Sequence, residues 1–188
     1  VMQAVTAEAQ PKIFSADGLH DVLMSMVIMP ATQDFPQEHM VRELLNQGRV
    51  AYIHFNSPHN RQPQRLLFAA EHLPLIEKIY AKHEFKIEPA IQLPAHLRLD
   101  VSEEEAVQQM LRGQLLYSGP VTAAELALSV GLLTSSVEAY LPAIEAGGSV
   151  MRGKFNGKVG GDAGSAESRW CDRRLLARMH RLTISESR

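Results

Sequence analysis

Apolar residues recur at helical spacing in the first part of the chain. One such run begins after Ser15 and Asp17, either of which can cap a helix that ends near Pro30. A second run, residues 40–45, predicts another helix, and Gly48 is suited to end it in a left-handed conformation. Two helices are therefore expected before residue 50.

A β-hairpin is expected next. Residues 49–55 are rich in β-branched and aromatic side chains, and after a cluster of turn-forming residues the segment 65–69 has the pattern of a returning strand. Residues 70–82 predict a helix, and the proline-containing stretch 83–100 predicts a connector between domains. The first expected unit, residues 15–88, thus has helix, helix and hairpin in the order of a winged-helix unit.

The second half carries two capping boxes. Ser102 is followed by Glu105, and Thr122 by Glu125, the spacing with which a hydroxyl and a carboxylate cap the start of a helix reciprocally. A third helix is expected to start at Thr134.

A wing is expected after these helices. Residues 149–155 predict a strand, and 156–168 form a glycine-rich loop. Helix, helix-turn-helix and wing is the order of a winged-helix domain, here over residues 101–160. We therefore expect a mainly α fold with small β-hairpins, in which two winged-helix-like units in tandem are followed by a C-terminal packing helix at 165–183.

The C-terminal stretch has two adjacent stripes at helical spacing. The apolar stripe is Leu175, Met179 and Leu182, and the basic stripe is Arg174, Arg178 and Arg181. One interpretation is an amphipathic helix that closes the domain and exposes its arginines to water. The other is a helix that presents those arginines to phosphates.

The distribution of charge bears on that choice. The net charge is −2, but residues 151–188 contain nine Lys or Arg against four Asp or Glu, which gives +5, and the rest of the chain carries −7. This split favours a polyanionic partner for the C-terminal fifth.

Composition restricts the class of protein. The chain has 188 residues, of which 45% are hydrophobic, enough for a sizeable core. The lone Cys171 excludes an internal disulfide and suits a reducing compartment, so a cytoplasmic location is expected. No signal peptide and no apolar run of membrane-spanning length is apparent. The first residue is Val1 rather than Met, which suggests a piece of a longer protein.

Candidate binding residues lie near the expected wing. Arg152, Lys154 and Lys158 cluster beside the glycine-rich loop, either as a nucleic-acid contact or as a solvated hairpin. The helix from Thr134 carries no Lys or Arg, so it is expected to pack rather than to enter a DNA groove.

Other residue types offer less chemistry. Trp170 is either a core anchor or a platform for an unpaired base. Cys171 lies next to two arginines, which would lower its pKa, but a nucleophile also needs a nearby His. The eight histidines are scattered, so no metal site is expected, and no catalytic constellation is apparent.

Several segments together resemble the large helicase-related (Lhr) family. The most specific is Trp170-Cys171-Asp172-Arg173-Arg174-Leu175-Leu176-Ala177-Arg178-Met179-His180-Arg181. Others are Gly119-Pro120-Val121-Thr122-Ala123-Ala124-Glu125-Leu126-Ala127, Val150-Met151-Arg152-Gly153-Lys154-Phe155, Leu19-His20-Asp21-Val22-Leu23 and Phe68-Ala69-Ala70-Glu71-His72-Leu73-Pro74. The matches span residues 18–182.

The resemblance implies the accessory domain of an ATP-dependent DNA helicase that acts in DNA repair. It also implies that ATP and Mg²⁺ bind in motor lobes outside this segment, since no phosphate-binding loop occurs here. The segment itself then needs no cofactor, and the hydrolase activity belongs to the parent protein. One departure is that the family continues as a charged helix after Thr183, where this chain ends in five other residues.

Three functions remain open. The first is an accessory domain that grips single-stranded or tailed DNA, or RNA, through Arg152, Lys154, Lys158, Arg174, Arg178 and Arg181, and that buttresses its own motor lobes. The second is a winged-helix scaffold that binds proteins without touching nucleic acid. The third is a transcriptional regulator, against which the lack of a basic recognition helix argues.

Overall fold

The structure, a computed structural model, describes residues 10–31, 38–153 and 168–177. Its helices are α2 (Ala16–Met26), α3 (Glu38–Asn46), α4 (Leu73–Ile79), α5 (Glu103–Ser118), α6 (Ala123–Val130) and α7 (Thr134–Ala146). The strands are β1 (Ile28–Pro30), β2 (Val50–Asn56), β3 (Pro63–Ala69), β4 (Phe85–Glu88), β5 (Val150–Gly153) and β6 (Arg169–Asp172). Two short 3-10 helices, η1 (Ala70–His72) and η2 (Ala95–Leu97), complete the order.

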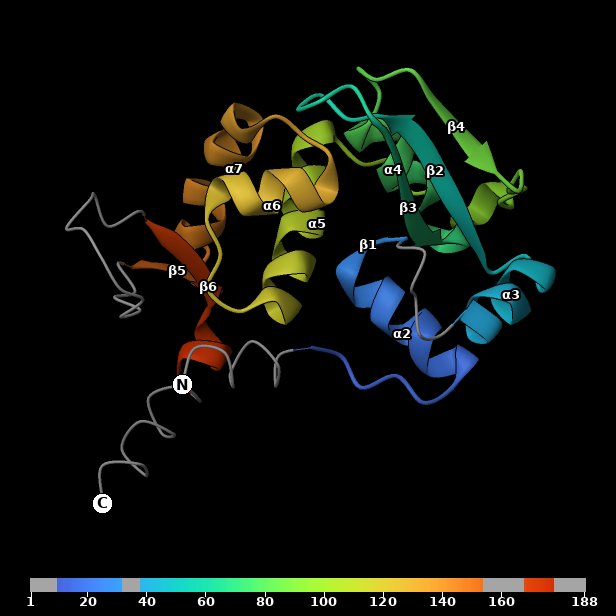
Figure 1. Ribbon diagram of the computed structural model, residues 1–188, viewed down its shortest axis with the longest axis horizontal. Helices are drawn as coiled ribbons and strands as arrows, with labels where there is room; N and C mark the ends of the chain where they lie inside the picture. The colour runs from blue at the N-terminus through green and yellow to red at the C-terminus, as the bar shows by residue number, and fades with distance from the viewer. Residues whose placement is uncertain (1–9, 32–37, 154–167, 178–188) are drawn as a thin grey trace.

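The first half is built on a four-stranded antiparallel sheet in the order β1-β3-β2-β4 (Figure 1). Its centre is the expected hairpin, in which Tyr52 of β2 lies opposite Leu67 of β3. On the other side of β2, Tyr52 lies opposite Glu88 of β4. The protein is therefore mixed α/β, and the expectation of a mainly α fold with only small hairpins is corrected here.

The two faces of this sheet serve different cores. Because side chains alternate along a strand, Ala51, Ile53 and Phe55 of β2 point to one face, where they join the large core with α4, α5, α6 and α7. Val50 and Tyr52 point to the other face, where α2 and α3 supply Leu19, Leu23, Val41 and Leu44. The helices therefore sandwich the Val50 end of the sheet.

Helix α5 runs through the middle of the molecule and contacts α2, α4, α7 and β6 (Figure 1). The expected capping box of Ser102 and Glu105 opens it. Gly113 lets α2 approach closely, since a Cβ there would lie 2.1 Å from the Ser25 carbonyl oxygen. The buried Gln114 side chain donates hydrogen bonds to the carbonyls of Met26 and Ile28, at 2.8 and 2.7 Å. These contacts fix the end of α2 and the start of β1 against α5.

The second half places a helix pair before a hairpin. The expected capping box of Thr122 and Glu125 opens α6, and Gly131 ends it in the left-handed region at φ +69°. Helices α6 and α7 then meet at 113°. Strands β5 and β6 pair antiparallel, and Trp170 also forms an isolated bridge with Val121, which precedes α6.

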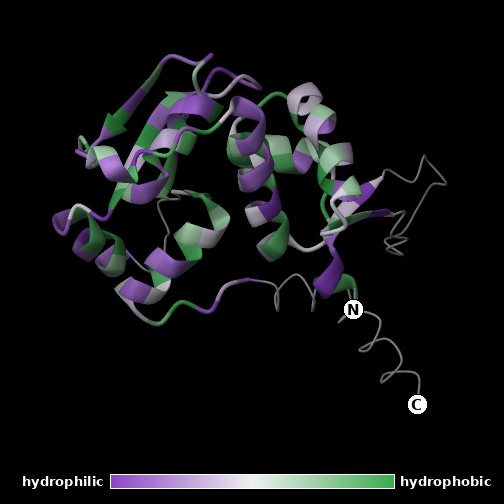
Figure 2. Cartoon of the chain, turned by 180° about the vertical axis from the view of Figure 1, so that it is seen from behind, coloured by the Kyte–Doolittle hydropathy of each residue, from purple (hydrophilic) through white to green (hydrophobic). Residues whose placement is uncertain are grey.

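The C-terminal stretch differs from the expected packing helix at 165–183. Residues 169–172 form strand β6, and the helix covers only 173–177 of the part that the structure describes. In Figure 2 this helical turn starts with hydrophilic colours and then becomes hydrophobic. Its buried Leu175 packs with Cys171. The stripes that suggested the helix begin only at Arg174, and the residues before them, 169–172, pair with β5 instead.

None of the described helices is alone both long and apolar enough to cross a membrane. The α6–α7 pair passes the same length and composition criteria only when its two bent helices are taken together. Leu126 and Leu141 of that pair are buried against the rest of the protein.

Candidate nucleic-acid interface

The hairpin β5–β6 is anchored firmly to the helices that precede it. Val121 donates a backbone hydrogen bond to Trp170 at 2.9 Å and accepts one from it at 2.7 Å. The Trp170 ring is 6% exposed and belongs to the large core. Trp170 is therefore the anchor of the hairpin, and its burial removes it as a platform for an unpaired base.

Arg152 is the predicted site residue that the structure places on this hairpin. Its guanidinium carbon lies 5.6 Å from the centroid of the Trp170 ring, within the range of a cation–π contact. Arg152 is exposed. It therefore presents a positive charge at the hairpin surface while its side chain rests on a fixed ring.

Arg169, although part of the basic C-terminal fifth, is committed within the protein. Its guanidinium donates to the Glu125 carboxylate at 3.1 Å and to the Pro120 carbonyl at 3.2 Å. Glu125 in turn accepts the Thr122 backbone N–H of the α6 cap at 2.8 Å. This cation ties β6 to the start of α6, so the C-terminal charge excess overstates what is free for a partner.

Arg174, two residues after the end of β6, lines a pocket of about 690 Å³. Arg112 of α5 and Arg173 line the same pocket. The Asp172 carboxylate accepts the Arg174 backbone N–H at 2.8 Å and so caps the helical turn. Arg152 does not line this pocket, so the two described members of the predicted site occupy different places.

The other four predicted site residues, Lys154, Lys158, Arg178 and Arg181, lie outside the described residues. The prediction missed Arg112 and Arg173. Arg173 stands in the C-terminal motif beside Arg174 and could have been included. Arg112 carries no local signal, because only the fold brings α5 next to the end of β6.

Helix α7 packs in the way its composition predicts. Val137, Leu141 and Ile144 are buried, and the helix has no basic residue. The turn before it is held by the His59 ring, whose Nε2 lies 2.7 Å from the Leu132 carbonyl oxygen. A further pocket of about 480 Å³ opens at its start, beside Lys82, which pairs with Glu103 at 2.7 Å. The surroundings of α7 therefore favour packing over insertion into a DNA groove.

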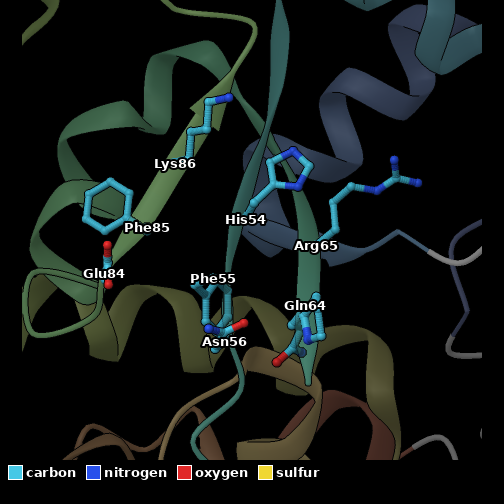
Figure 3. Close-up of a pocket in the computed structure, with 9 residues that line it drawn as sticks. His54, Phe55, Asn56, Gln64, Arg65, Glu84, Phe85 and Lys86 are labelled. Carbon is cyan, nitrogen blue, oxygen red and sulfur yellow. The ribbon is translucent and has the colours of Figure 1, made fainter. Parts of the chain in front are cut away.

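A third pocket, of about 420 Å³, lies at the end of the four-stranded sheet where Asn56 of β2 pairs with Pro63 of β3 (Figure 3). His54, Arg65 and Lys86 project from neighbouring strands there. Lys86 is ion-paired with Glu88, and Glu84 also lines the pocket. The positive charges of this pocket are therefore balanced by nearby carboxylates.

Cys171 does not have the chemistry that its arginine neighbours suggested. The side chain is buried, and burial, with a smaller effect of Asp172, raises the pKa of its thiol to about 12. A thiol with such a pKa is protonated at neutral pH and is a poor nucleophile. The expected lowering of this pKa is wrong, because burial of the thiol and the neighbouring Asp172 carboxylate both raise it.

Comparison with known proteins adds no assignment: no protein-family model matches the chain, and no curated protein matches it. Among residues 10–31, 38–153 and 168–177, no three His, Cys, Asp or Glu side chains are grouped so that they could hold a metal ion.

Proposed function

We propose that this chain is the accessory, non-motor part of an ATP-dependent DNA helicase of the Lhr type. In this proposal it acts in the cytoplasm, grips or guides single-stranded DNA, and buttresses the motor lobes that bind ATP and Mg²⁺. The sequence resemblance supplies the parent protein, and the geometry of the second half supports nucleic-acid contact.

The observation that carries the proposal is the hairpin β5–β6, which follows the α6–α7 pair along the chain. Two helices at 113°, joined by a three-residue turn, fit a helix-turn-helix, and the hairpin that follows fits a wing. The Val121–Trp170 bridge adds the short strand segment between the first two helices. With an acidic α7, the cationic hairpin bearing Arg152 is the better surface for a phosphate backbone.

The proposal is tested by titrating the protein with single-stranded DNA at several salt concentrations. We expect weak binding whose log K falls steeply with log[salt], and Arg152→Ala is expected to lower the slope by roughly 0.7, the value for one phosphate contact on a single strand. The matched control is Arg42→Ala on α3, where Arg42 pairs with Glu38 at 2.8 Å. Absence of binding at low salt would refute the proposal.

One observation favours a protein–protein scaffold instead. Leu128 in α6 and Leu133 in the turn before α7 are 55% and 51% exposed. Exposed leucines beside a helix without cations suit a protein partner. If single-stranded DNA does not bind while Leu128→Ser and Leu133→Ser weaken association with the isolated motor lobes, the scaffold is the correct function.

A further inference from the structure

The pocket beside Arg174 draws its walls from both halves of the chain. Ser25 comes from α2, Arg112 from α5, Ser149 from the loop after α7, and Arg173 and Arg174 from the turn after β6. We call it the arginine pocket, defined by Arg112, Arg173 and Arg174. Its volume of about 690 Å³ exceeds what one inorganic anion fills and suits a nucleotide-sized group.

The charge of the arginine pocket is one-sided. Its three guanidinium groups are cations and offer N–H donors only. The one carboxylate in its lining, Asp172, is 8% exposed and is occupied by the Arg174 backbone N–H. Within the described residues, no carboxylate pairs with any of the three arginines. The pocket at the end of the four-stranded sheet has no such excess of positive charge, because Glu84 and Glu88 offset its cations.

The frame around these arginines is held by packing and backbone hydrogen bonds. The Arg173 backbone N–H donates to the Ser149 carbonyl at 3.0 Å, and its guanidinium approaches the Gly148 carbonyl at 3.5 Å. Gly113, which also lines the pocket, packs closely against the Ser25 carbonyl. The backbone positions of the arginines are therefore set before any ligand arrives, which lowers the cost of binding.

We infer that the arginine pocket binds a phosphate group of a single nucleic-acid strand. Guanidinium groups offer paired N–H donors that match phosphate oxygens, and the Ser149 hydroxyl and the Gln109 amide supply neutral donors at the same pocket. This inference rests on the proposed function and adds a second contact to the one at Arg152, which does not line this pocket. The phosphate is either an internal phosphodiester or the terminal phosphate of a strand end.

The test compares a short oligothymidylate carrying a 5′-hydroxyl with the same strand carrying a 5′-phosphate. Arg112→Ala with Arg173→Ala is expected to lower the slope of log K against log[salt] by about 0.7, the value for the one phosphate that the pocket neutralises. When Arg112→Lys replaces Arg112→Ala in this double variant, one of the two charges is kept. This variant is expected to restore part of the slope but not the full affinity of the wild type. The matched control is Arg42→Ala with Arg98→Ala, which removes two exposed arginines elsewhere and should leave the slope unchanged.

The two strands identify the source of the phosphate. Tighter binding of the 5′-phosphorylated strand, lost in the double variant, assigns a terminal phosphate; equal binding of both strands assigns the backbone. If the wild-type protein binds DNA and the double variant keeps the same slope, the inference is overturned while the proposed function stands. If the wild-type protein binds neither strand, both fall. A melting curve for each variant confirms that the fold is retained.

Discussion

At the scale of single residues, a buried pair of histidines lies where α2 meets η1. His20 contacts Glu71, with 3.1 Å between Nε2 and the carboxylate oxygen. His72 is 5% exposed, and its Nδ1 is buried with no hydrogen-bond partner among the described residues. Burial lowers the pKa of His72, although Glu71 and a backbone hydrogen bond with Val27 oppose the shift. Protonation of this imidazole is therefore less favourable in the folded protein than in the unfolded chain.

This burial predicts a loss of stability in mild acid. The unfolded chain binds a proton at His72 near pH 6.5, its ordinary pKa, whereas the folded chain does so only at lower pH. The free energy of unfolding should therefore fall as the pH drops below about 6.5 and should level off below the folded pKa. His83, whose pKa burial also lowers, contributes in the same direction.

The measurement is urea denaturation between pH 7.5 and 5. In His72→Leu the fall with acid should be visibly shallower than in the wild type. His96→Leu is the control, because His96 is exposed in η2 and its loss should leave the pH profile intact. An equally steep fall in His72→Leu would show that other groups govern the acid response.

At the scale of elements, the second half shows what local sequence determines. Both capping boxes form as predicted, because a cap requires only residues three positions apart. The α6 cap has an additional role, since its Glu125 also receives Arg169 of β6. One local motif thus starts a helix and holds the hairpin.

The α6 cap therefore predicts a measurable cost for Thr122→Ala. Its hydroxyl accepts the Glu125 backbone N–H at 3.1 Å, and the residue is 3% exposed. Losing this bond should lower the free energy of unfolding by about 0.5–2 kcal/mol. Thr134→Ala is the matched control: it opens α7 after Leu133, which makes no side-chain cap, and should change stability by less than about 0.5 kcal/mol. Equal effects in urea denaturation would refute a capping role.

Elements that depend on distant partners were harder to predict. Strands β1 and β4 have only three and four residues and exist because β3 and β2 lie beside them. The helix expected at 165–183 included residues 169–172, but these residues pair with β5 and form strand β6. Helix propensity is a weak preference that such tertiary contacts override.

The candidate site divides in the same way. Arg152 and Arg174 could be proposed because each lies within a basic run of sequence. Arg112 is an isolated arginine on a helix and becomes a candidate only when α5 packs beside the end of β6. Conversely, Arg169 looked equivalent to its basic neighbours, and only the structure shows that Glu125 holds it.

At the scale of the whole molecule, one core joins the two halves of the chain. It runs from Ile53 and Phe55 of the sheet through α5 to Val137 and Trp170. The Tyr80 hydroxyl also donates to the Val130 carbonyl at 2.6 Å, and this connects α4 with the end of α6. The predicted division at 83–100 stays a prediction, but burial on this scale should make both halves unfold in a single transition.

A close approach between the halves, at Gly131, gives a test of that coupling. Gly131 has φ +69°, and a Cβ there would lie 2.4 Å from the Phe55 ring. Gly131→Ala should therefore combine left-handed strain of about 1–2 kcal/mol with an overpacking cost of about 1–3 kcal/mol. Gly48→Ala, at φ +67° with nothing within 4 Å, carries the strain alone and is the control.

Trp170 fluorescence reports unfolding of the second half, and far-UV circular dichroism reports unfolding of the whole chain. We expect Gly131→Ala to lower both urea midpoints together and further than Gly48→Ala does. Separate midpoints for the two probes would mean that the halves unfold independently, and equal shifts in the two variants would mean that Phe55 yields without cost.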